Sequence, residues 1–124
     1  MERCFHVERA RLLQYVAGYE ERKRARVAQI AETAAKGRAA SSKLAEICRG
    51  YGARRVRLFG SLVTGRYGAT PDIDLAVEGV PADRFFDLLA TLQIEAAPLE
   101  IDVVDLADAP AELRDRIQAE GVDL

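Results

Sequence analysis

The sequence has few of the residues that build disulfide and zinc sites, since its 124 residues include only two cysteines and one histidine. Cys4 and Cys48 form no CxxC pair and have no histidine cluster nearby, so neither a disulfide framework nor a zinc site is indicated. We expect two reduced thiols. His6 has no second metal ligand or nucleophile beside it, and we interpret it as a surface or helix-packing residue.

Long apolar runs and a basic excess are also lacking. The charged amino terminus does not fit a secretory signal, and no segment approaches the length of a membrane span, so we expect a cytoplasmic protein without a membrane partner. The formal net charge is -2, from 18 Lys and Arg against 20 Asp and Glu. This balance disfavours long-range binding of RNA by the chain alone, although RNA stays open as a partner.

What is present is an ordinary globular composition, 49% hydrophobic and 31% charged, in a chain long enough for one compact core. Residues 7–35 contain no proline and are rich in helix formers, which predicts one long helix or two joined near Gly18. The segment 36–38 predicts a stop. A second helix, capped by Ser41 or Ser42, is then expected to end at the glycines that follow residue 49.

Short apolar runs and helical spacings alternate in the rest of the chain. They predict strands at 56–59, 73–77 and 99–104, and helices at 81–95 and 110–119. The last helix is expected to begin with Asp108 as its cap. This order predicts an α/β (α+β) fold with a small sheet of at least three strands flanked by helices. We divide the chain into an N-terminal helical extension, 1–37, and a domain that carries the chemistry, 38–124.

Gly60-Ser61 follows the first predicted strand and leads into a helical turn. Such a turn leaves backbone N–H groups pointing outward, which favours a phosphate. Gly60 has no side chain to block close approach. Ser61 can add its hydroxyl as a donor, although the same residue can serve only as a helix cap.

Three aspartates are the candidate metal ligands. Asp72 and Asp74 are two residues apart, so on a strand they share one face, and their repulsion calls for a cation such as Mg²⁺. Asp102 interrupts an apolar strand and is the best third carboxylate. Glu100 shares its face and is a weaker alternative, whereas Asp105 falls on the opposite face and is expected to begin the next loop.

Simpler interpretations remain open for these residues. Asp72 and Asp74 can be a solvated turn at the start of a strand, and Asp102 can be a charge on an edge strand. Four arginines can form a basic rim for phosphates or RNA, or an ordinary solvated surface. These arginines are Arg54, Arg55, Arg57 and Arg66.

The combined pattern resembles the minimal nucleotidyltransferases of the DNA polymerase beta superfamily over roughly residues 44–104. It consists of Gly60-Ser61, ten further residues, Asp72-x-Asp74 and a later strand aspartate, Asp102. The resemblance implies the nucleotidyltransferase fold, with a mixed sheet. It also implies two Mg²⁺ ions on the three aspartates and an acceptor hydroxyl activated near Asp102.

By the same resemblance, ATP is the substrate, its triphosphate held by Gly60, Ser61, Gly65 and Arg66. Relatives include antitoxins that transfer AMP to a tyrosine of a helical HEPN-type toxin, which is the role and partner we expect. Transfer to a small molecule or to an RNA end is an alternative. A weakly active or inactive binding module is another, because Thr64 stands where relatives often have a basic residue and Pro71 where many have serine. The N-terminal helix suits a homo-oligomer contact.

Overall fold

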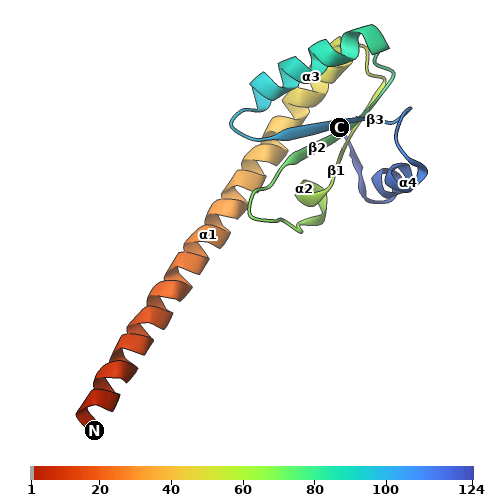
Figure 1. Cartoon of the computed structure of the whole chain (residues 1–124). Coiled ribbons are helices and arrows are strands. Elements are labelled where there is room, and N and C mark those ends of the chain that lie inside the picture. Colours follow the sequence, from red (N-terminus) through yellow and green to blue (C-terminus); the bar gives the residue numbers. More distant parts are fainter. Residues whose placement is uncertain (1) are drawn as a thin grey trace. The chain divides into compact units, whose positions relative to one another are not determined.

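The computed structural model describes residues 2–124, with side chains described from residue 9 onward, so the expectations for Cys4 and His6 lie outside the described side chains. The chain divides into two compact units, residues 1–32 and 33–124. The elements are α1 (Glu2–Gly50), β1 (Arg55–Phe59), α2 (Ser61–Thr64), β2 (Ile73–Glu78), α3 (Ala82–Ala96), β3 (Ile101–Asp105), α4 (Ala111–Glu120) and β4 (Val122–Asp123) (Figure 1). Within the described part of the chain, no helix is apolar enough over a sufficient length to cross a membrane.

The helix α1 passes without a break through residues 36–38, so the predicted stop there is wrong. Gly37 is buried, and a β-carbon at this position would lie 3.0 Å from Cδ1 of Leu62. The glycine therefore serves close packing inside a helix, where we had interpreted it as a terminator. The predicted end is confirmed, because the N–H of Gly52 closes the last turn on the carbonyl of Arg49.

The three predicted strands are confirmed and form a four-stranded mixed sheet in the order β3-β2-β1-β4. β1 pairs antiparallel with β2 and with β4, and β2 pairs parallel with β3. The fourth strand was not predicted. It has only two residues, Val122 and Asp123, which is too short for an alternating pattern to be recognised.

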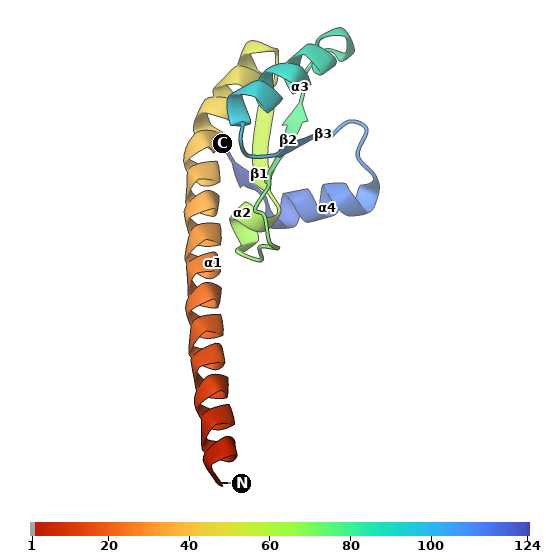
Figure 2. The same cartoon turned by 60° about the vertical axis from the view of Figure 1, so that its left-hand side comes forward.

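The two faces of the sheet bury different helices. The larger core joins β1 and β2 to residues 33–50 of α1 and to α3, and it includes Leu44, Leu58, Leu75 and Leu88. The smaller core joins Ala76 on the other face to Ile117 of α4. Figure 2 shows α3 and α4 on opposite sides of the sheet. Two layers of helices therefore cover this small sheet, as the nucleotidyltransferase fold requires.

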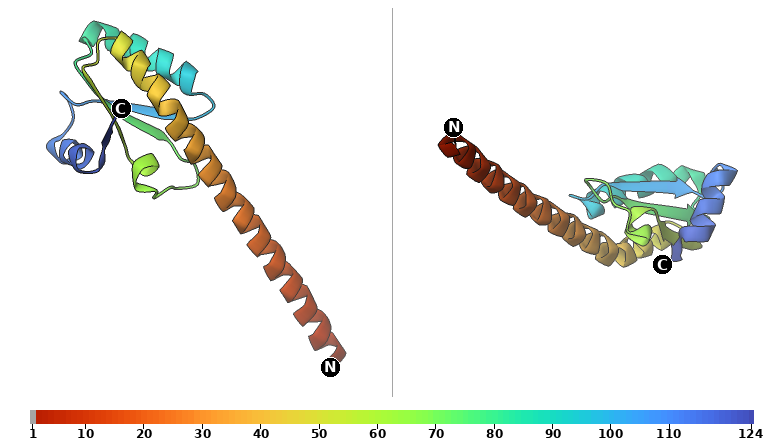
Figure 3. Two further views of the ribbon diagram at one scale, coloured as in Figure 1. Left: turned by 180° about the vertical axis from the view of Figure 1, so that it is seen from behind. Right: turned by 90° about the horizontal axis from the view of Figure 1, so that it is seen from below.

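The end of α1 and the helix α3 lie side by side over the larger core (Figure 3). Lys43 Nζ lies 3.1 Å from Glu95 Oε2, and the hydroxyls of Tyr51 and Thr91 are 2.9 Å apart. Cys48 is a buried free thiol in this layer, and burial raises its pKa to about 11. The sequence predicted a reduced thiol for Cys48, and its burial is an addition from the structure.

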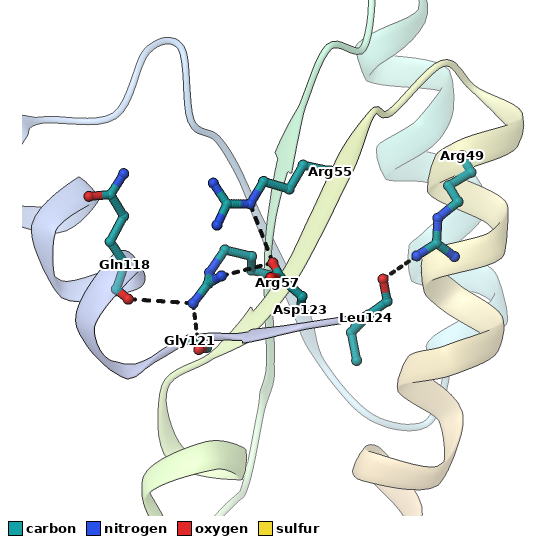
Figure 4. Close-up of polar contacts among 7 residues, drawn as sticks. All are labelled: Arg49, Arg55, Arg57, Gln118, Gly121, Asp123 and Leu124. Atoms are coloured by element: carbon teal, nitrogen blue, oxygen red, sulfur yellow. Dashed lines mark hydrogen bonds and ion pairs between the residues drawn. The ribbon is translucent and has the colours of Figure 1, made fainter.

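A buried arginine fastens the short strand β4 to the sheet (Figure 4). Arg57 is only 7% exposed. Its Nη1 donates to Asp123 Oδ1 at 2.8 Å and its Nη2 to the carbonyl of Gly121 at 2.5 Å. Arg49 donates to the carbonyl of Leu124, and the Leu124 N–H donates to the carbonyl of Val56. These contacts fix the two-residue strand β4 along the edge of β1.

The helix α4 begins one residue later than predicted and with a different cap. Its N-cap is Pro110, which makes no side-chain hydrogen bond, so the predicted cap at Asp108 is wrong. The Asp108 N–H instead donates to the carbonyl of Asp105 in the turn after β3. The proline sets the entry into the helix, since its fixed φ suits the start of a helix.

Candidate functional site

Asp74 and Asp102 lie directly opposite each other on the parallel strands β2 and β3. Asp72 precedes the first residue of β2 by one position. Because side chains alternate along a strand, Asp74 shares its face with Ala76, which packs against α4. Asp72 and Asp74 are partly buried, whereas Asp102 is exposed. The sheet thus aligns two of the predicted carboxylates by register and holds the third next to them.

The three carboxylates interact electrostatically, and the effect is seen in the pKa of Asp74. Burial, followed by the negative charges of Asp102 and Asp72, raises the pKa of Asp74 to about 6. Arg116 of α4 opposes this effect. A cation at this position would offset both the desolvation cost of the charged Asp74 carboxylate and its repulsion by the other two aspartates. Arg116 was not among the predicted residues, and nothing in the sequence separates it from other surface arginines, because its position depends on how α4 packs.

The turn that ends β1 lies against the same carboxylate. Phe59 pairs with Asp74 in the antiparallel ladder, and Gly60 follows it with a φ of 74°. A β-carbon on Gly60 would come within 2.1 Å of Asp74 Oδ2. Any other residue at position 60 would therefore force the turn and the carboxylate apart, in addition to the strain of a positive φ.

The turn continues directly into α2. Val63 and Thr64 donate their N–H groups to the carbonyl of Gly60 at 3.1 and 3.0 Å. The N–H groups of Ser61 and Leu62 come before this hydrogen-bonded turn, so by position they have no partner within the helix. The N-cap is Gly60, and Ser61 is the first helical residue, so the alternative in which Ser61 serves only as the cap is wrong. The geometry leaves two backbone donors next to Asp74.

Gly65 and Arg66 occupy the connection from α2 to β2. Gly65 ends α2 in a left-handed conformation, with a φ of 76°, and its N–H donates to the carbonyl of Ser61. Arg66 is exposed, and its N–H donates to Thr64 Oγ1 at 3.3 Å. Within the part of the chain whose side chains are described, neither residue is hydrogen bonded to the three aspartates. The structure therefore places them beside the turn but does not bring them into the carboxylate group.

A hydrogen bond from α1 also holds the connection between α2 and β2, and the sequence did not predict it. Arg38 Nη1 donates to the hydroxyl of Tyr67 at 2.8 Å, joining the loop to the part of α1 that belongs to residues 33–124. The two residues are 29 positions apart, and no local pattern in the sequence pairs them.

The donor set fits Mg²⁺, although the side chains do not converge to a closed cage. Among the residues whose side chains are described, no three His, Cys, Asp or Glu form a group that could by itself hold a metal ion. Mg²⁺ usually takes one or two carboxylates and completes its shell with water and substrate phosphates, so an open arrangement suits it. Asp72, Asp74 and Asp102 are the residues that could hold it.

Two surface hollows differ in their relation to these aspartates. One, of about 400 Å³, is lined by Gln93, Leu99, Glu100, Ile101 and Asp102. A larger one, of about 590 Å³, is lined in part by Arg54, Arg55 and Glu78. Arg55 pairs with Glu78 at one end of the β1–β2 ladder and Phe59 pairs with Asp74 at the other, so the larger hollow lies away from the aspartates. The smaller hollow shares Asp102 with the candidate site.

The four arginines expected as a common rim are dispersed. Arg54 and Arg55 line the larger hollow, and Arg66 is on the loop before β2. Arg57 is buried and holds β4, so its inclusion in a rim is wrong. Arg57 follows two other arginines, Arg54 and Arg55, and nothing in the sequence indicated that its side chain alone is buried.

Comparison with known proteins agrees with this geometry. Residues 42–124 match the family model described as polymerase beta, nucleotidyltransferase. A search of curated proteins found no match. A solved structure assigned as a minimal nucleotidyltransferase is 26% identical, with a TM-score of 0.62, and the alignment covers 73% of this chain and 95% of that one.

Two other similar structures are toxin–antitoxin complexes. One, with AMP-PNP, is 25% identical over 66% of this chain and 69% of that one, with a TM-score of 0.56. The other is a tri-AMPylated HEPN toxin from Shewanella oneidensis with its MNT antitoxin. It is 23% identical over 70% of each chain, with a TM-score of 0.54, and so shows a shared fold.

Proposed function

Because this chain belongs to the polymerase beta nucleotidyltransferase family, we propose that it transfers AMP from ATP to an acceptor hydroxyl and releases pyrophosphate. The acceptor is a tyrosine of a HEPN-type toxin, and the chain acts as the antitoxin. The observation that carries the proposal is the register of Asp74 opposite Asp102, with the Gly60 turn against Asp74. The toxin–antitoxin complexes among the similar structures support the choice of partner.

The turn after β1 holds the triphosphate. The backbone N–H groups of Ser61 and Leu62 are donors at a helix start, which suits phosphate oxygens. The Ser61 hydroxyl adds a further donor. Gly65 lets the chain turn back toward β2, and Arg66 supplies a positive charge on that loop. These four groups bind and orient the nucleotide next to the carboxylates.

Asp72, Asp74 and Asp102 are the residues that would hold two Mg²⁺ ions. When bound, Mg²⁺ would supply charge neutralisation and would make the acceptor hydroxyl easier to deprotonate. Asp102 is exposed and lines the hollow of about 400 Å³, which gives an acceptor side chain access to it. Asp74, deeper in the site, is fixed by the turn at Gly60.

In the transfer, the acceptor oxygen forms a bond to the α-phosphorus and the bond from that phosphorus to the bridging oxygen breaks. The electron pair of the broken bond leaves with pyrophosphate. Asp102 accepts the hydroxyl proton. Positioning and charge stabilisation supply most of the rate enhancement in such reactions, and a carboxylate set fixed by strand register provides the positioning.

We also propose residues 38–124 as the nucleotidyltransferase domain and residues 1–37 as an extension. The family match from residue 42 and the compact unit from residue 33 both support a boundary within the long helix.

The test is transfer of α-³²P from ATP, with Mg²⁺, to a purified HEPN-type toxin from the source organism. We expect label on the toxin, and mass spectrometry should place AMP on a tyrosine. Asp74→Asn should abolish labelling. Asp87→Asn, the same change on the exposed surface of α3, is the matched control and should label normally. A folded protein that labels no toxin, or that labels RNA, would reject the proposed acceptor.

A further inference from the structure

In the first unit, residues 1–32, the side chains described from residue 9 onward include large apolar ones that are exposed. This unit is a single stretch of α1, drawn in red and orange in Figure 1. The exposed fractions are 61% for Leu12, 62% for Leu13, 67% for Tyr15, 42% for Val16, 47% for Tyr19 and 59% for Val27. Exposed apolar side chains do not stabilise a helix that is surrounded by water. Such side chains are typical of a surface that another helix covers.

Three of these residues, Leu13, Val16 and Val27, follow the spacing of a coiled-coil seam, whereas Leu12, Tyr15 and Tyr19 lie off it. Steps of three and four residues lead along α1 through Leu13, Val16, Glu20, Lys23, Val27 and Ile30. The same steps continue through Ala34, Gly37, Ser41, Leu44 and Cys48, all buried in the second unit. Alternating steps of three and four place residues on one stripe of a helix and fit a partner helix along that stripe. The first half of the stripe therefore has the pattern of a helix interface.

The stripe is complementary to itself when two copies run antiparallel. With the centre of the pair between Glu21 and Arg22, Glu20 of one copy faces Lys23 of the other. Val16 then faces Val27, and Leu13 faces Ile30. Each apolar position meets an apolar position, and each charge meets the opposite charge. We propose that a second copy of this chain covers this stripe, through an antiparallel pairing of the two α1 helices in this register.

Other arrangements of the same two helices are unfavourable. A parallel pair in register would place Glu20 against Glu20 and Lys23 against Lys23. An antiparallel pair shifted by one heptad would place Lys23 against Leu13, or Glu20 against Ile30. Each of these arrangements buries a charge without a partner of opposite sign. The free energy lost by burying an unpaired charge is far larger than the free energy gained from an exposed ion pair. The two central charges thus select one orientation and one register.

The charges specify the pairing and the apolar side chains provide its affinity. Glu20 already lies 3.8 Å from Arg24 within the same helix, but both side chains are largely exposed, and such pairs contribute little. The stripe from Leu13 to Ile30 spans roughly 27 Å at 1.5 Å per residue, with four apolar layers around two charged ones. A contact of this small size is expected to give a dimer that dissociates on dilution.

Charge reversal tests the register on the full chain, by sedimentation equilibrium over a range of concentrations. Glu20→Lys alone and Lys23→Glu alone should each weaken the dimer by about tenfold or more. The double variant restores the opposite-charge pairs and should recover the affinity of the original chain. Glu21→Lys changes the same charge one position off the stripe and is the matched control. A monomer at every concentration, or a double variant as weak as the singles, would overturn the proposal.

Cysteine cross-linking tests the orientation, in a Cys4→Ser background. A mixture of the Val16→Cys and Val27→Cys chains should form an intermolecular disulfide on mild oxidation. Neither variant alone should do so, because residue 16 faces residue 27 in the antiparallel pair. Cross-linking of Val16→Cys with itself would show a parallel pair and reject the proposed arrangement. Neither measurement needs catalytic activity, so Asp74→Asn should dimerise like the original chain.

Discussion

The α-carbon of Gly60 lies so close to the Asp74 carboxylate that a β-carbon there would approach Oδ2 to 2.1 Å. This contact joins the proposed phosphate turn to the proposed metal ligand without an intervening side chain. Both groups come from the sheet itself, one from the end of β1 and one from the start of β2. The geometry between the proposed phosphate turn and the proposed metal ligand is therefore determined by backbone pairing.

Gly60→Ala should remove transfer activity and destabilise the fold. The β-carbon must displace Asp74, and the positive φ adds strain, for a combined loss of about 2–4 kcal/mol. Gly65→Ala is the matched control, because its φ of 76° is similar but its β-carbon would meet nothing within 4 Å. We expect a loss of about 1 kcal/mol there. Urea unfolding and transfer assays on both variants check this, and equal effects would show that the contact with Asp74 is unimportant.

Asp74→Asn should stabilise the metal-free protein while it abolishes transfer. The folded state raises the pKa of Asp74 from 3.8 to about 6, so the folded protein holds this proton more tightly than the unfolded chain. This tighter proton binding stabilises the folded state fully below pH 3.8, and the stabilisation is lost as the pH rises through 6. After allowance for solvent screening, the variant should gain about 1 kcal/mol at pH 7.5.

The same variant should gain little at pH 4, where the original carboxyl group is largely protonated in the folded state. Thermal unfolding at both pH values checks the sign. Mg²⁺ with ATP should raise the melting temperature of the original chain and leave that of Asp74→Asn unchanged, because ligands stabilise only the state that binds them. A variant that is less stable than the original chain at pH 7.5 would contradict the repulsion among the three aspartates.

Arg57→Ala should cost far more stability than Arg55→Ala, although both arginines pair with Asp123. The Arg57 side chain is buried and also holds the Gly121 carbonyl, so its loss leaves a cavity and unpaired acceptors, for about 2–4 kcal/mol. Arg55 is a more exposed partner and should cost less than about 1 kcal/mol. Denaturant midpoints of the two variants give the comparison. Similar midpoints would mean that β4 contributes little to the fold.

Thr64→Lys should improve the use of ATP. Thr64 is the exposed last residue of α2, on the turn that we propose for the triphosphate. A lysine there adds a positive charge near the phosphates and should lower KM for ATP by about three- to tenfold, with kcat nearly unchanged. Ala90→Lys adds the same charge on the exposed side of α3 and should leave KM unchanged. An unchanged KM in Thr64→Lys would place the triphosphate elsewhere.

The alignment of Asp74 and Asp102 illustrates what the sequence can predict. Short strands with period-two spacing were enough to expect both carboxylates on one sheet, and the structure places them opposite each other. The sequence could not show that Gly37 lies inside a helix, because the reason is the packing of Leu62 from a distant segment. A glycine between two charged residues is typical of a helix end, and the tertiary contact overrides that local preference.

Other features depend on contacts between segments far apart in the chain. β4 has two residues, and it is a strand because Arg57 and Val56 hold it against β1. Arg116 affects Asp74 only because α4 packs over Ala76. No spacing rule relates these residues, since the distances along the chain differ from those in space. Local patterns thus predicted the elements and the carboxylates, while the neighbours that modify the site were found only in the folded chain.

The register of β3 against β2 has a consequence for the quality of any purified sample. A slip of one residue would turn Asp102 toward the face on which Leu75 packs against Leu88 and Leu92 of α3, where its charge would have no partner. Such a molecule would unfold and would not persist as a compact, inactive form. The folded fraction of a preparation should therefore equal its fraction of molecules with aligned carboxylates, so specific activity can be standardised by a simple unfolding curve.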